Sequence, residues 1–281
     1  MAGDHSNSFF GNKKCAFRAS LRSILIFFVI LTGVSDVSAG ILEFFGLSPS
    51  IPSLQHAPGQ NSLIYFRKNS SETIIPYTDS IKNFFNDYSG LNEKYEKNID
   101  HECSRLFSRP KNGKFCPFKL EYLENCSPTK TDGNFGYDIS KPCIFLTLNE
   151  VKDWTPQVFN ETDINQITDD NLRAKYAKMP DFLKEAIANV RDPLDRNLIW
   201  VSCEGASPQD VENIGPVLYS PLRGFPASYF PYKNVEGYQS PIVAVQLERP
   251  RPGVMITVEC KIWAKNLDET KSHTFEILID S

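Results

Sequence analysis

Residues 253–263 read GVMITVECKIW, and apolar side chains occupy every second position from Val254 to Ile262. A period of two is typical of a β-strand that buries one of its two faces. The same period recurs in three further segments: NLIWVSC (197–203), PIVAVQL (241–247) and HTFEILID (273–280). We therefore predict half-buried antiparallel strands packed as a sandwich, with a mainly-β fold over the C-terminal part of the chain.

Two cysteines fall on the apolar faces of these predicted strands. Cys203 shares a face with Ile199 and Val201, and Cys260 shares one with Val258 and Ile262. A bridge between the two cysteines would run through the core and join two strands, as in a sandwich of the immunoglobulin type. The sequence thus predicts an immunoglobulin-like sandwich.

Helical segments interrupt the predicted strands. Asp79 is placed to cap a helix whose apolar face carries Ile81, Phe84, Phe85 and Tyr88. Residues 164–190 predict a helix in two pieces, broken at Pro180. The adjacent Asp169 and Asp170 could do acid/base chemistry. The favoured interpretation is that they lie at the start of a helical piece, where Asp satisfies free backbone N–H groups.

An apolar run begins at Ile24 and extends, with interruptions, to Leu47. As a helix it would be about 36 Å long, enough to span a bilayer. Basic residues precede the run, and no Lys or Arg follows it until Arg67, so the N-terminus is predicted to be cytoplasmic. The predicted organisation is a cytoplasmic tail (1–23), a transmembrane signal-anchor helix (24–47), a stalk (48–78) and a disulfide-bonded extracellular domain (79–281).

The apolar run also allows a second interpretation. Asp36 lies at its centre, and Val37, Ser38 and Ala39 resemble the small-residue site at which a signal peptide is cleaved. Cleavage near Ala39 would yield a secreted or cell-surface adhesion glycoprotein. A retained anchor is favoured, and both interpretations export the rest of the chain. Asp36 is either an intramembrane functional group or the mark of a weak anchor or a cleavage region.

The cysteines and glycosylation sequons agree with export. Cys15 lies on the cytoplasmic side, and the other six of the seven cysteines lie on the outer side, where thiols oxidise and 15 pairings are open to them. Three N-x-S/T sequons begin on the same side, at Asn69, Asn125 and Asn160. The net charge of −4 argues against a nucleic-acid partner.

Motifs for catalysis and for cofactors are absent from the sequence. None of the four histidines pairs with another at metal-ligand spacing, and no nucleophile elbow, phosphate loop or zinc-protease motif occurs. We therefore expect no catalytic site, no metal and no cofactor. Aromatic residues gather at Tyr229, Phe230 and Tyr232, in a Gly/Pro-rich segment between strands. They form either a partner interface or a loop folded onto the domain's own core.

Ordered blocks from residue 103 onward resemble the β subunits of the P-type sodium/potassium and proton/potassium pumps. The blocks are Cys116 with Leu123, Cys126 and Ser127; Gly136-Tyr137, Lys141-Pro142-Cys143 and Leu148-Asn149; Val201-Ser202-Cys203-Glu204-Gly205; Glu212-Asn213-Ile214-Gly215-Pro216; Tyr229-Phe230-Pro231-Tyr232; and Val258-Glu259-Cys260-Lys261. They cover about 180 residues in order. The sequence is identified as a member of this family, with departures from its pattern in the anchor.

The resemblance implies a pairing for the six outer cysteines. The pairs are Cys103 with Cys116, Cys126 with Cys143, and Cys203 with Cys260. It also implies a type II single-pass plasma-membrane glycoprotein that is not an enzyme and that assists a catalytic α subunit. The implied tasks are folding, assembly and delivery of that subunit, and adjustment of its potassium affinity during sodium and potassium transport.

The anchor carries the implied membrane contacts. Phe27 and Phe28 resemble the family's aromatic-rich helix, which packs against the α subunit, whereas Leu31, Thr32 and Asp36 depart from the family pattern. Membrane lipid is the other expected partner of the anchor. The resemblance therefore implies partner binding by Phe27 and Phe28, with Tyr229, Phe230 and Tyr232 as an extracellular contact. Which α subunit is bound, and whether the pump moves sodium or protons, stays open.

Overall fold

A computed structural model describes residues 51–59, 62–160, 167–190, 197–267 and 271–280. These residues belong to one compact unit, Ser50–Ser281. The predicted cytoplasmic tail and transmembrane helix lie outside the described residues. Within the described ranges, no helix combines the length and the apolar character that a bilayer crossing requires.

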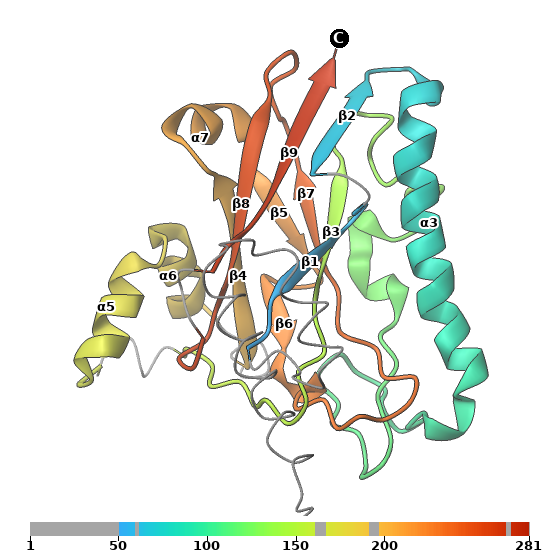
Figure 1. The fold of residues 1–281 in the computed structure, drawn as a ribbon, viewed down its shortest axis with the longest axis vertical. Helices are drawn as coiled ribbons and strands as arrows, with labels where there is room; N and C mark the ends of the chain where they lie inside the picture. The colour runs from blue at the N-terminus through green and yellow to red at the C-terminus, as the bar shows by residue number, and fades with distance from the viewer. Residues whose placement is uncertain (1–50, 60–61, 161–166, 191–196, 268–270, 281) are drawn as a thin grey trace, which may run out of the picture. The chain divides into compact units, whose positions relative to one another are not determined.

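Two β-sheets form the centre of the unit (Figure 1). The four-stranded sheet has the order β1 (Leu54–Ala57), β3 (Cys143–Leu148), β7 (Val243–Leu247) and β5 (Val217–Ser220). The five-stranded sheet has the order β2 (Leu63–Arg67), β9 (His273–Asp280), β8 (Ile256–Trp263), β4 (Leu198–Gly205) and β6 (Gly224–Pro226). Neighbours in these sheets are antiparallel except for β2 and β9, which run parallel.

One buried cluster contains apolar side chains of both sheets, among them Ile144, Val245, Val201, Ile256 and Ile277. Strands β8 and β9 alternate between buried and half-buried residues along their length, as the period of two predicts. The predicted mainly-β sandwich is therefore present.

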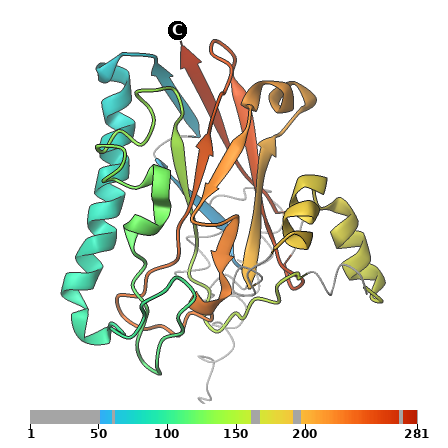
Figure 2. The ribbon, with the colours of Figure 1, turned by 180° about the vertical axis from the view of Figure 1, so that it is seen from behind.

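Helices lie on two opposite sides of the sheets (Figures 1 and 2). The longest is α3 (Ser71–Lys94); the others are α5 (Asp170–Lys178), α6 (Asp181–Ala188) and α7 (Pro208–Ile214), with the short 3₁₀ helices η1 (Glu96–Asn98), η2 (Leu120–Cys126) and η3 (Ala227–Tyr229). On one side, Phe85 of α3 meets Phe145 of β3 edge to face, with ring centroids 4.9 Å apart.

Two strands correct the prediction that the strands are half-buried. In β4, Ile199 and Val201 enter the core between the sheets, while Trp200 enters a second buried cluster with Leu183 and Ile187 of α6. Every residue of β4 except Glu204 is buried, and all of β7 is buried. Both faces of these strands are therefore covered, which a period of two cannot indicate.

Helix α3 begins eight residues earlier than Asp79. Its first turns contain Pro76, and its buried face carries Ile74 and Thr78 as well as Ile81 and Phe85. A proline removes one backbone hydrogen bond from a helix. Contacts outside the helix stabilise its start: the Tyr77 hydroxyl accepts a hydrogen bond of 2.9 Å from the backbone N–H of Tyr65 in β2.

The segment that the sequence suggests as a stalk contains β1 and β2. Leu54–Ala57 pairs with β3, and Leu63–Arg67 pairs with β9. The sandwich therefore begins near Ser50 and not at residue 79. Pro49 and Pro52 precede β1 and Pro58 follows it, so the strand itself contains no proline.

The two-piece helix is confirmed over residues 170–188. Pro180 separates α5 from α6. The Asp169 carboxylate accepts hydrogen bonds of 2.8 and 3.0 Å from the backbone N–H groups of Asn171 and Leu172. Asp169 thus caps a helix, as expected, and Asp170 pairs with Arg173 on the exposed surface.

Candidate functional site

The structure contains three disulfides. They join Cys103 to Cys116, Cys126 to Cys143, and Cys203 to Cys260, the pairing that the family resemblance implies. The first closes the loop that carries residues 104–115, and the second ties the end of η2 to the first residue of β3.

The third disulfide corrects the immunoglobulin comparison. Cys203 and Cys260 face each other across the antiparallel neighbours β4 and β8, with their Cα atoms 4.1 Å apart. Both residues are buried. The bridge therefore staples two strands of one sheet and does not connect the two sheets across the core.

The aromatic loop is partly folded onto the core. Tyr229 is only 6% exposed, and its ring centroid lies 6.3 Å from that of Phe118. Burial raises the pKa of Tyr229. Tyr229 is thus a core residue, and its ring is not on the surface that a partner would meet.

The other two residues of the aromatic cluster retain some exposed surface. Phe230 is half-buried and meets Trp154 edge to face at 5.7 Å. Tyr232 is also half-buried, and its ring centroid lies 5.0 Å from that of Tyr238. Burial, followed by a hydrogen bond with Glu150, raises the pKa of Tyr232 to about 12. Phe230 and Tyr232 are therefore the members of the cluster that a partner can reach.

A cavity of about 370 Å³ lies beside this loop. One wall comes from residues 109–116 and the other mainly from residues 227–238. Four basic side chains line it, Arg109, Lys111, Lys114 and Lys233, and none of its described lining residues is acidic. The sequence shows the basic run RPKNGK at 109–114 but does not show that Lys233 lies opposite it.

Two of the four histidines meet although they are 217 residues apart. His56 Nδ1 of β1 lies 2.6 Å from His273 Nε2 of β9, and the His56 ring stacks on Phe275 at 5.2 Å. Two neutral imidazoles at this distance share one N–H between them. Burial, followed by the charge of His273, lowers the pKa of His56 to about 4, and burial lowers the pKa of His273.

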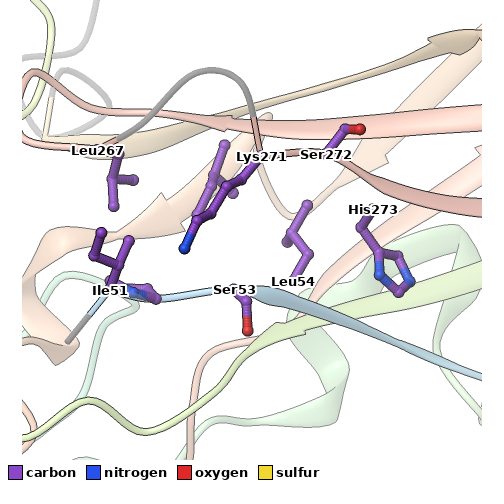
Figure 3. Close-up of a pocket in the computed structure, with 9 residues that line it drawn as sticks. Ile51, Ser53, Leu54, Leu267, Lys271, Ser272 and His273 are labelled. Carbon is purple, nitrogen blue, oxygen red and sulfur yellow. The ribbon is translucent and has the colours of Figure 1, made fainter. Parts of the chain in front are cut away.

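A smaller cavity of about 140 Å³ adjoins the histidine pair (Figure 3). Ile51, three residues before β1, and Leu54, its first residue, line one side, and Lys271, Ser272 and His273 line the other. Among the described residues, no group of three or more His, Cys, Asp or Glu side chains is placed to hold a metal ion. The His56–His273 pair joins β1 of the four-stranded sheet to β9 of the five-stranded sheet.

The predicted glycosylation residues differ in exposure. Asn69 follows β2 in a turn and is exposed, with a positive φ of 62°. Asn125 is exposed next to the buried Cys126, and Asn160 is half-buried. Glycosylation of all three stays a prediction. The predicted membrane contacts Phe27 and Phe28 lie outside the described residues.

Comparison with known proteins identifies the class to which this disulfide-bonded sandwich belongs. A family model described as the sodium/potassium ATPase beta chain matches residues 40–279. Subunit beta-2 of the sodium/potassium-transporting ATPase of Drosophila melanogaster is 35% identical, over 98% of this chain and 88% of the relative. Subunit beta-1 of the same fly is 37% identical, over 59% and 50%.

A more distant relative is the probable sodium/potassium-transporting ATPase subunit beta-3 of Caenorhabditis briggsae. It is 26% identical, over 81% of this chain and 63% of the relative. The match to the fly beta-2 subunit covers nearly the whole chain, and the family model covers every described residue except Asp280. The chain belongs to the sodium/potassium ATPase beta chain family.

Proposed function

We propose that this chain is the non-catalytic β subunit of a sodium/potassium-transporting P-type ATPase. It assists the catalytic α subunit in folding, assembly and delivery to the plasma membrane, and it modulates the potassium affinity of the complex. ATP hydrolysis and ion coordination belong to the α subunit.

The observation that carries this proposal is the extent of the family match. The relative from Drosophila melanogaster is aligned over 88% of its own length, so the similarity is not confined to one shared module. A sandwich with two tightly packed sheets and three disulfides supplies a rigid surface for a partner. A partner that binds only the folded α subunit stabilises it by mass action.

The proposed topology is type II and single-pass. The apolar run at 24–47 anchors the chain in the membrane, with residues 1–23 in the cytoplasm and the sandwich outside the cell. The four basic residues before this run support that orientation. Disulfides persist in the oxidising compartment that this topology gives to the sandwich.

The proposed contacts with the α subunit fall in two places. Phe27 and Phe28 act within the membrane, and Phe230 and Tyr232 act on the extracellular side. The half-buried state of Phe230 and Tyr232 leaves part of each ring available. Tyr229 supports this loop from beneath, since it is buried against Phe118.

The first test is co-purification of the full chain from detergent-solubilised membranes, followed by mass spectrometry of the mature protein. We expect an intact N-terminal tail and a co-purified P-type ATPase α subunit. A mature chain that begins near Gly40, without a pump subunit, would establish the secreted adhesion glycoprotein instead.

A second test separates the proposed contacts from the general effect of membrane insertion. The double variant Phe27→Ala and Phe28→Ala is compared with Leu25→Ala, which also removes apolar volume from the anchor. We expect the double variant to lower the amount of co-purified α subunit and its surface delivery, and Leu25→Ala to retain both. Potassium activation of ATP hydrolysis, measured on the purified complex, then tests the modulating role.

A further inference from the structure

The cavity between residues 109–116 and residues 227–238 has a charge opposite to that of the whole chain. The chain has a net charge of −4, yet the charged groups that line the cavity are Arg109, Lys111, Lys114 and Lys233. A concave surface lined by one sign of charge raises the local concentration of ions of the other sign. The cavity therefore favours an anion.

Two of the four cations already have partners. Lys111 Nζ pairs with Glu102 at 2.5 Å, and Lys114 Nζ donates to the Ile99 carbonyl at 3.2 Å. Arg109 and Lys233 have no acidic partner among the described residues. Arg109 and Lys233 come from the two different segments that line the cavity, so a ligand that spans the cavity lies between these segments.

The acidic groups near the cavity interact with groups other than Arg109 and Lys233: Asp100 accepts a hydrogen bond from the backbone N–H of Lys111, and Glu102 pairs with the Lys111 side chain. Glu150 hydrogen-bonds to Tyr232, and neither residue lines the cavity. The positive charge of Arg109 and Lys233 is therefore left for a ligand or for solvent ions.

An unpartnered hydroxyl provides an independent observation. Ser228 lines the same cavity and is only 7% exposed. Its Oγ is buried and has no hydrogen-bond partner among the described residues. A buried polar group without a partner is unfavourable, and native structures usually satisfy such groups. Because Oγ itself is not exposed to the cavity, a hydrogen bond from Ser228 to an anionic oxygen there requires rotation of the side chain toward the cavity.

The size and the walls of the cavity indicate more than a bare ion. Its volume of about 370 Å³ is in the range of small-molecule sites. The rings of Phe230 and Tyr238 and the side chain of Pro231 form part of its lining. Such a site accommodates a small organic group attached to the anion.

We propose that this cavity is a binding site for a phosphate group carried by a small organic molecule, with Arg109 and Lys233 as the cationic contacts and Ser228 as a hydroxyl donor. The free phosphate ester and the headgroup of a membrane phospholipid present the same chemistry. The cavity is formed by residues of this chain, but one of them, Phe230, is also a proposed contact of the α subunit. The test therefore uses the chain without that subunit.

The test uses the full chain in a neutral detergent, with glycerol 3-phosphate as the probe and glycerol as the uncharged control, followed by calorimetry. We expect saturable binding of glycerol 3-phosphate that weakens with added salt, and none of glycerol. Arg109→Gln and Lys233→Gln should each raise the dissociation constant about tenfold. Lys130→Gln, at an exposed position outside the cavity, should leave it unchanged.

Ser228→Ala distinguishes binding from a structural role. The hydroxyl has no hydrogen-bond partner to lose among the described residues, so thermal stability should stay the same or rise. The dissociation constant should rise roughly threefold to tenfold, as expected for one lost hydrogen bond. A loss of stability without any change in binding would contradict the assignment of Ser228.

A lipid arm identifies the source of the phosphate. The chain is reconstituted in phosphatidylcholine discs with and without phosphatidic acid. If phosphatidic acid occupies the site, glycerol 3-phosphate should bind more weakly in the discs that contain it, and Lys233→Gln should remove this difference between the discs. That result assigns the site to a headgroup. Equal binding of glycerol 3-phosphate in both discs assigns it to a free ester. Absence of saturable binding in detergent and in both discs, or equal weakening by Lys130→Gln, would overturn the proposal.

Discussion

At the scale of single residues, His56 and His273 connect β1 to β9 through two rings whose nitrogens lie 2.6 Å apart. Burial lowers the pKa of His56 from 6.5 to about 4. Between these two pH values the ring is neutral in the folded chain and mostly protonated in the unfolded chain. The pair's contribution to stability is complete above about pH 6.5 and is lost as the pH falls from there toward 4.

We predict that the free energy of unfolding falls by roughly 1 kcal/mol between about pH 7 and about pH 5 because of His56, after allowance for its partial exposure. Denaturant unfolding of the disulfide-bonded chain at several pH values measures this change. His56→Gln should remove that part of the pH dependence, whereas His101→Gln, at an exposed position, should preserve it. Equal pH dependence in both variants would rule out the pair as its source.

Gln239 connects two segments of the chain through its buried side-chain amide. It is 1% exposed, and its Oε1 accepts a hydrogen bond of 3.0 Å from the backbone N–H of Phe118. Its Nε2 donates to the Tyr88 carbonyl at 2.5 Å and to Asn92 Oδ1 at 3.1 Å. One amide thus connects the C-terminal half of α3 to the segment that precedes η2.

Gln239→Leu should lower the free energy of unfolding by about 2–4 kcal/mol, since it leaves the buried N–H of Phe118 without an acceptor. Urea unfolding of the variant checks this value. Gln157→Leu, at an exposed position, serves as the control and should change stability by less than about 0.5 kcal/mol. A neutral Gln239→Leu would mean that Phe118 has another hydrogen-bond acceptor.

At the scale of the element, two glycines have opposite surroundings. A Cβ added at Gly205, the last residue of β4, would lie 2.2 Å from the backbone nitrogen of Val211 in α7. A Cβ at Gly90 in α3 would meet nothing within 4 Å. Helix α7 therefore packs on β4 only because position 205 has no side chain.

We predict that Gly205→Ala destabilises the sandwich by about 3 kcal/mol or more, because the clash is with backbone. Gly90→Ala should stabilise it by about 0.5–1 kcal/mol, since alanine favours the helix interior. Thermal unfolding of both variants measures the two effects side by side. Destabilisation by Gly90→Ala would show that α3 makes a contact at this position that the described structure lacks.

The elements differ in how far the sequence could predict them. Strands β8 and β9 have one covered face, so their alternating pattern is visible in the sequence. Strand β4 has α6 on one side and the core on the other, so its pattern has no polar face. The start of α3 was missed because Pro76 suggests a helix boundary, and the contact between Tyr77 and Tyr65 that offsets it is tertiary.

At the scale of the whole molecule, the disulfides close loops of very different length. Cys203 and Cys260 are 57 residues apart, and Cys103 and Cys116 are 13 apart. Chain-entropy estimates give about 4 kcal/mol for the first bridge and about 3 kcal/mol for the second. Paired alanine substitutions should reproduce this order in denaturant unfolding. A larger loss from the shorter loop would indicate that local packing around residues 103–116 dominates.

The candidate sites were less predictable than the fold. The cysteine pairing followed from the family resemblance, because six cysteines alone allow 15 pairings. The aromatic cluster was found, but the sequence could not show that Tyr229 is buried while Phe230 and Tyr232 are half-buried. The basic cavity and the histidine pair join residues more than 100 positions apart, and no local pattern reports such distances.

The parallel pairing of β2 with β9 has a consequence for synthesis. Leu63 lies opposite Glu276 and Arg67 opposite Asp280, so one of the earliest strands of the sandwich has its partner in the last ten residues of the chain. β9 is the last strand of the sandwich, so it is translated only after all the other strands. The edge of β2 that pairs with β9 therefore stays unpaired while some two hundred residues are translated. Until then its free backbone groups can pair with a wrong strand or bind a chaperone.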